Sequence, residues 1–337
     1  MKYNRTGQAV CSRIVWILFF SVGHFINSLS QSPLPANLQL TEVAPTDILA
    51  SRTIVLHDCN FTDKELKDIQ KSFQQTGIDA VAYFETDVVF SGKDVTKSFA
   101  EYFVSRQAKY LLFLEKSGGM FILTAVLFNQ QRSLFDPAQP VWREKKPLLN
   151  ELLRQVFQDS WLNQKKQNYL INDFPETDIV VDPFKGTRQE FYAIDLKVDL
   201  LAVPKFGNEQ QDKELEQFFQ THYPLKYKMT EAGTDEQELR RQGFSYILCY
   251  VRTRGKAARE ILGYDMTKGE SAYASITFPA GQLQLKTLPS ETVVYKFYFR
   301  HIGNGNVFFG TKWDADINWQ DALKNHVLGF KTELKIY

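Results

Sequence analysis

The sequence predicts an α/β protein built from two related units. Each unit reads as a βαβαβ arrangement with a hairpin, a mixed sheet and a closing amphipathic helix, and additional strands give the second half α+β character. Three observations support this. The order of strand-like and helix-like runs repeats, the string Asp63–Leu66 recurs as Asp212–Leu215, and 337 residues suit about two domains. A composition of 44% hydrophobic and 23% charged residues is typical of a folded chain.

The first unit is expected over residues 52–172. A capping box of Thr62 and Glu65 opens its first helix, which ends at Gly77. Gly118 and Gly119 form a hairpin turn. The expected strands are Thr53–Asp58, Ile78–Phe84, Tyr110–Glu115 and Met120–Phe128, and further helices are expected at Asp94–Ser105 and Pro147–Trp161.

A linker over 173–195 leads to the second unit over 196–337, which carries an additional β-hairpin. Crossover helices predict parallel strands and hairpins predict antiparallel ones, so each sheet should be mixed. The expected strands are Asp199–Val203, Leu225–Met229, Tyr246–Arg252, Glu260–Asp265, Ala272–Phe278, Val293–Ile302 and Val307–Lys312, and the helices are Glu209–His222, one opened by Thr234, and Asn318–Lys331. The shared order predicts an internal duplication, and a paired architecture offers a groove between the copies.

Residues 1–30 have the features of a signal peptide, followed by a polar lead-in over 31–51. Lys2, Arg5 and Arg13 precede the apolar run Ile14–Ile26, and small residues precede the Ser30/Gln31 bond. Cleavage there predicts a periplasmic or secreted protein. The alternative is a membrane-anchored protein that keeps this segment uncleaved.

The charge balance argues against nucleic-acid binding through bulk charge. The chain has 40 basic and 39 acidic residues, and cleavage after Ser30 leaves 37 and 39, a formal −2. No later apolar run is long enough to span a membrane, so we expect no membrane span in the mature chain. The partner is expected to be a protein or a small ligand.

Common catalytic motifs are missing from the sequence. It contains no phosphate-binding loop, dinucleotide fingerprint, Gly-x-Ser-x-Gly, His-Glu-x-x-His, Cys-x-x-Cys or calcium loop. We therefore expect no cofactor and no metal site. The element order resembles α/β domains of bacterial envelope proteins that bind other proteins. Together these points favour an exported, non-enzymatic binding or envelope-assembly protein over an enzyme.

The strongest candidate for chemistry is the group His57, Asp58 and Cys59 at the carboxyl end of the first strand. Open α/β sheets bind ligands at such ends. A Cys–His pair could supply a thiolate nucleophile, which gives the alternative of an exported hydrolase or transferase. The structural interpretation is a strand end whose polar groups bond to loop amides.

Arg252, Arg254, Lys256 and Arg259 form a basic stretch that could bind an anionic ligand. The commoner explanation is a solvated strand edge protected by charge.

Two further sets of residues permit more than one interpretation. Cys59 and Cys249 could form a disulfide in an oxidising compartment or remain free thiols. The carboxylate pairs Asp314/Asp316 and Asp178/Asp182 could bind a cation or serve glycoside hydrolysis, although loop carboxylates are the simpler interpretation.

Overall fold

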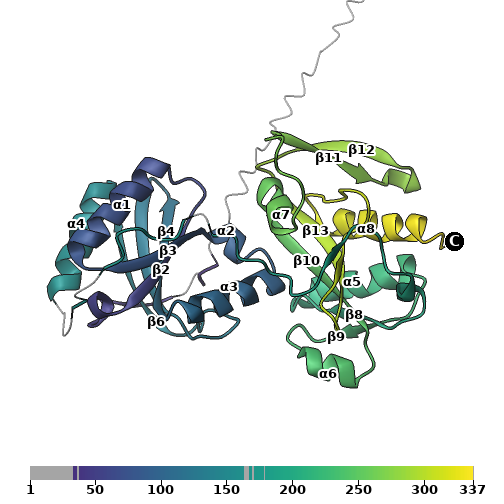
Figure 1. Ribbon diagram of the computed structural model, residues 1–337, viewed down its shortest axis with the longest axis horizontal. Helices are drawn as coiled ribbons and strands as arrows, with labels where there is room; N and C mark the ends of the chain where they lie inside the picture. Colours follow the sequence, from purple (N-terminus) through teal and green to yellow (C-terminus); the bar gives the residue numbers. More distant parts are fainter. Residues whose placement is uncertain (1–32, 36–37, 163–166, 169–170, 178, 337) are drawn as a thin grey trace, which may run out of the picture. The chain divides into compact units, whose positions relative to one another are not determined.

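The computed structural model describes residues 33–35, 38–162, 167–168, 171–177 and 179–336 (Figure 1). They belong to one compact unit, Ser32–Tyr337. The predicted signal peptide and Asp178 lie outside the described residues. Within the described ranges, no helix is both long enough and apolar enough to cross a bilayer.

The first sheet is mixed and has the strand order β1-β6-β5-β4-β2-β3. The central strand β2 pairs in parallel with β3 and β4, and β1 pairs in parallel with β6. The pairs β4–β5 and β5–β6 are antiparallel. The strands are β1 (Gln39–Thr41), β2 (Arg52–His57), β3 (Asp79–Glu85), β4 (Ala108–Ser117), β5 (Met120–Leu127) and β6 (Pro140–Lys146).

Helices cover both faces of this sheet. The helices α1 (Asp63–Thr76) and α4 (Leu149–Leu162) share a core cluster with one face, and α3 (Lys93–Ser105) packs on the other. Short turns of helix lie at η1 (Ile48–Ala50) and α2 (Thr86–Val89). The capping box that opens α1 is present: the Thr62 hydroxyl accepts the N–H of Glu65, and the N–H of Thr62 donates to the Glu65 carboxylate at 2.7 Å.

The second sheet has the order β7-β14-β13-β10-β8-β9, in which every strand takes the place of a strand in the first sheet. It is also mixed, because β8 pairs in parallel with β9 and β10 whereas β10 pairs antiparallel with β13. Its elements are β7 (Arg188–Gln189), η2 (Ile194–Lys197), β8 (Leu201–Pro204), α5 (Glu209–His222), β9 (Tyr227–Thr230), α6 (Glu236–Arg241), β10 (Tyr246–Arg254), β13 (Val293–His301), β14 (Val307–Phe308) and α8 (Trp319–Glu333).

The predicted α/β class with two mixed sheets and closing helices is confirmed. The edge strands β1 and β7 were not expected, since they lie in the polar lead-in and the linker. Each pairs in parallel with the last strand of its sheet. The matching topology supports two related units, and duplication as their origin stays a prediction.

An insertion distinguishes the second unit. It comprises α7 (Gly255–Ile261), β11 (Ala272–Thr277), η3 (Pro279–Gly281) and β12 (Gln284–Pro289), where the first unit has only Gly118 and Gly119. The expected strand Glu260–Asp265 is wrong, because Glu260 and Ile261 end helix α7. Ala257 and Ala258 favour helix there. The true hairpin partner of β10 is β13, which follows the insertion.

The two sheets share one hydrophobic core in which α3 contacts both β4 and β10 (Figure 1). The cluster joins Phe84 and Phe99 of the first unit to Val251 and Tyr298 of the second. Beside it, the N–H of Arg252 donates to the carbonyl of Ser91 at 2.6 Å. The first unit therefore satisfies part of the edge of β10.

Gly92 gives a test of this junction. A Cβ atom at Gly92 would lie 2.5 Å from the backbone oxygen of Tyr250. We expect Gly92→Ala to lower the free energy of unfolding by about 1–3 kcal/mol through this clash. Gly233→Ala is the matched control, because its Cβ would meet nothing within 4 Å, and it should change stability by less than about 1 kcal/mol. Urea denaturation measures both, and equal effects would contradict the close approach.

Candidate functional site

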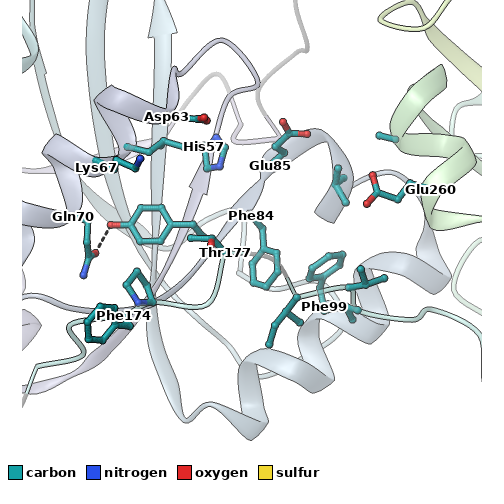
Figure 2. Close-up of a pocket in the computed structure, with 18 of the residues that line it drawn as sticks. His57, Asp63, Lys67, Gln70, Phe84, Glu85, Phe99, Phe174, Thr177 and Glu260 are labelled. Atoms are coloured by element: carbon teal, nitrogen blue, oxygen red, sulfur yellow. Dashed lines mark hydrogen bonds between the residues drawn. The ribbon is translucent and has the colours of Figure 1, made fainter. Parts of the chain in front are cut away.

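A cavity of about 1110 Å³ lies between the two α/β units (Figure 2). Its walls come from α1, from the carboxyl ends of β2 and β3, from α2 and α3, from the linker, and from α7 of the second unit. The cavity therefore occupies the groove expected between the copies, at the edge where open α/β sheets bind ligands.

Much of the cavity wall is apolar. Phe84 and Phe99 contact each other edge to face with ring centroids 5.0 Å apart, and Figure 2 shows both side chains along one wall. The apolar lining residues are Leu66, Tyr83, Phe84, Val88, Phe99, Phe174, Pro175, Ile179, Val180, Val181, Ala257 and Ile261. Such a wall can bury the apolar body of a ligand.

The polar side of the cavity is one face of α1. Asp63, Lys67, Gln70, Lys71 and Gln74 recur at helical spacing and all line the cavity. Lys67 and Lys71 are exposed and have no ion-pair partner in the described part of the chain. Two cations thus stay available to a ligand.

Gln70 and Gln74 hold the linker in place. Gln70 donates to the carbonyl of Asn172 at 3.2 Å and accepts the Tyr83 hydroxyl at 2.7 Å, drawn in Figure 2. Gln74 donates to the carbonyl of Asp173 at 3.1 Å. These bonds fix the linker beside α1.

The linker also pairs with the edge of β3. The N–H of Tyr83 donates to the carbonyl of Glu176 at 3.0 Å, and the N–H of Glu176 donates to Val81 at 2.9 Å. The Glu176 carboxylate pairs with Arg106 at 2.6 Å. Next to this anchor, Phe174 lines the cavity with 88% of its surface exposed.

The residues His57, Asp58 and Cys59 were predicted as one group, but they lie in different surroundings, and only His57 lines the cavity. His57 lines the cavity, and its Nδ1 lies 3.0 Å from the carbonyl of Asp58. Burial lowers the pKa of His57, which favours the neutral ring. Strand β2 ends at His57, so Cys59 lies in a turn, exposed and outside the cavity lining. Although the residue is exposed, partial desolvation of its thiol raises the pKa of Cys59, the opposite of nucleophile activation.

Asp58 faces neighbouring carboxylates at this edge. Its Oδ2 accepts the N–H of Lys116 at 3.0 Å. Burial raises the pKa of Asp58 to about 6; the Lys116 N–H opposes this shift, and the charges of Glu115 and Asp87 add to it. The folded protein therefore binds a proton on Asp58 more tightly than the unfolded chain does.

Among the predicted basic residues, Arg254 reaches this edge, where carboxylates of the protein itself bind it. Its Nε donates to Asp87 at 2.8 Å, Nη1 to Glu291 at 3.1 Å, and Nη2 to Glu85. Burial lowers the pKa of Arg254, but Asp87 and Glu85 more than offset this, so the net pKa is raised. Arg254 is an internal counterion that joins the end of β10 to β3 and α2.

The other three basic residues do not converge with Arg254. Arg252 lies over the Tyr295 ring at 5.6 Å. The backbone N–H of Lys256 donates to Ser290 at 2.9 Å, while its side chain is exposed. The guanidinium of Arg259 lies among aromatic rings, over Tyr273 at 4.4 Å, Tyr264 at 5.5 Å and Trp313 at 5.7 Å.

Among the described residues, the two cysteines and the carboxylates Asp182, Asp314 and Asp316 form no shared site. Cys59 and Cys249 are both free thiols, so the structure holds no disulfide between them. Asp316 binds Lys286 at 2.6 Å and Asp182 binds Arg188 at 2.8 Å. Among the described residues, no group of three or more metal-binding side chains occurs.

The core of the second unit contains a second ionic cluster, which was not predicted from the sequence. Lys296 Nζ lies 2.7 Å from Asp314, and His326 Nδ1 lies 3.1 Å from Asp314 and from the Tyr192 hydroxyl. Lys296 also donates to the carbonyl of Phe309 at 2.8 Å. Burial lowers the pKa of His326. The members are buried within the protein, so the cluster is part of the core rather than a site open to a ligand.

The sequence reasoning also missed Glu85, Asp87, Lys67 and Lys71. A signal for the first two existed, because they follow the predicted strand Ile78–Phe84 and parallel strands end at a common edge. No local signal distinguished the two lysines. They line a cavity only because the linker and α7, distant in sequence, form its other walls. Figure 2 shows Glu260 of α7 on the wall opposite Lys67.

Comparison with known proteins adds no relative: no model of a protein family matches the chain, and no curated protein matches it.

Asp58→Asn should stabilise the protein at pH 7.5, because it removes a buried charge while an acceptor oxygen remains for the N–H of Lys116. The gain should be about 1–2 kcal/mol after allowance for partial exposure. It should shrink as the pH falls through about 6 toward 4, where the folded wild type protonates Asp58. Asp68→Asn, at an exposed position of α1, is the control without this gain. Denaturation curves at both pH values test this, and a pH-independent gain would contradict it.

Proposed function

We propose that this protein is an exported, non-enzymatic binding or envelope-assembly protein whose ligand occupies the cavity between its two α/β units. The observation that carries the proposal is the position of the cavity, at the carboxyl ends of β2 and β3, with α7 of the second unit as a wall. Its volume of about 1110 Å³ is close to the upper end of the range usual for ligand sites, about 300–1,000 Å³.

The lining favours an amphipathic ligand. An apolar body would contact Phe84, Phe99 and Ile261, and a polar or anionic end would face Lys67 and Lys71 on α1. Glu85 also lines the cavity, but its carboxylate is already paired with Arg254. The ligand should therefore gain affinity from burial of apolar surface and orientation from the lysines.

The arrangement of titratable groups supports binding rather than catalysis. The ring of His57 is favoured in its neutral form and lies against the carbonyl of Asp58, and Cys59 lies outside the cavity lining with a raised pKa. The alternative of a hydrolase or transferase has one supporting observation, that His57 lines the cavity. Turnover that is lost in Cys59→Ala with unchanged melting temperature would favour that alternative.

Export rests on the basic and apolar segment at the N-terminus. Mass spectrometry of the protein isolated from its native cells should give Gln31 as the first residue. Intact Met1 would overturn cleavage and favour the anchored alternative.

The dye 8-anilinonaphthalene-1-sulfonate, with an aromatic body and an anionic group, is a suitable probe of the cavity. Val88→Trp fills part of the lining and should weaken dye binding at least about tenfold, or ~1.4 kcal/mol. Leu127→Trp, on β5 outside the lining, and Cys59→Ala should leave the dissociation constant unchanged. Fluorescence titration measures all four proteins, and equal affinity of Val88→Trp and wild type would contradict the cavity as the site.

A further inference from the structure

The insertion of the second unit ends in a two-stranded sheet whose outer strand is open. We infer that β12 is the interface through which two copies of this chain associate, by antiparallel pairing of β12 with β12 of the second copy. The inference is independent of the cavity, because no residue of β12 lines it.

The backbone register directs hydrogen-bonding groups of β12 outward. Ile276 of β11 lies opposite Leu285 of β12, yet its N–H donates to Trp313 at 2.8 Å on the other side. Ile276 and Leu285 are thus a non-hydrogen-bonded pair. The N–H and carbonyl of Leu285 therefore point away from β11, and by alternation those of Thr287, also in β12, do so too. In the described part of the chain these groups meet no backbone partner on that side.

The usual protection of an edge strand is weak in β12. Lys286 is the only charged residue of β12. The Nζ of Lys286 binds the Asp316 carboxylate at 2.6 Å, so its ammonium group points toward the second unit and not toward a strand that would pair with β12. Pro289 blocks pairing only at the end of the strand. By contrast, the edge of β3 is covered by Glu176, and that of β11 is covered by Trp313.

The outer face of this hairpin is apolar. Leu285 on β12 and Leu283, which directly precedes the strand, have 69% and 60% of their surfaces exposed. Ile276, opposite Leu285, adds to them and is only partly buried. Leu288 and Lys286 alternate to the inner face, where Leu288 is buried. The open edge thus offers both backbone bonds and apolar surface.

A second copy fits this edge because β12 is complementary to itself. A two-fold axis at Leu285 places Leu285 opposite its own equivalent, so this pair can exchange two backbone bonds, and it brings Leu283, which directly precedes β12, near Thr287. The four leucines then form one apolar cluster across the interface. Lys286 lies opposite Gln284, so no like charges oppose each other.

The test is the oligomeric state of the mature chain in sedimentation equilibrium. Wild type should form a dimer at about 100 µM that dissociates on dilution. Leu285→Lys places two ammonium groups opposite each other, and Leu285→Pro removes an outward N–H; each should raise the dimer dissociation constant at least about tenfold. Ile194→Lys is the matched control, since Ile194 has the same 69% exposure in η2.

Hydrogen exchange supplies a second measurement on the unsubstituted protein. The amides of Leu285 and Thr287 should exchange more slowly at dimer concentrations than after dilution. A wild-type protein that stays monomeric overturns the proposal. The edge of β12 would then be a site for an extended segment of a different chain. A dimer that persists in both Leu285 variants, or that Ile194→Lys weakens equally, overturns it as well.

Discussion

The ionic contacts of Arg254 tie the two sheets together at the site. The guanidinium lies at the end of β10 and binds Glu85, the last residue of β3, and Asp87 of α2. Thr253 donates to the same Asp87 carboxylate at 2.9 Å. Since both acids lie at the carboxyl edge of the first sheet, these contacts place the second unit against that edge. The shared core around α3 then fills the space behind them.

The cavity is a consequence of this joining. The first unit supplies the polar face of α1 and the aromatic wall of Phe84 and Phe99, and the second supplies α7. The linker, with Phe174 and Val181, completes the lining. Arg254 already pairs with Glu85 and Asp87, and the unpaired lysines of the lining are Lys67 and Lys71, with exposed acids around them. A chain of paired α/β units can thus create a cavity at the junction.

The differences between the units are as informative as their likeness. One strand order serves both sheets, but a two-glycine turn in the first corresponds to residues 255–292 in the second. This insertion supplies two features of the protein. Its helix α7 forms part of the cavity wall, and its hairpin β11–β12 has an unpaired edge with exposed leucines. Loops and insertions on a common scaffold are where proteins place specific interactions.

Local signals in the sequence determined much of the fold. Apolar periodicity located most strands and helices, and Thr62 and Glu65 located the start of α1. The order of elements predicted two mixed sheets and put His57 at the carboxyl edge of the first sheet, where it lines the cavity. Only the tertiary structure decided the pairing of β10 with β13, the edge strands β1 and β7, and the partners of Arg254 and Lys296. The reason is physical: capping and periodicity act within a few residues, whereas strand pairing and buried ion pairs join residues far apart along the chain.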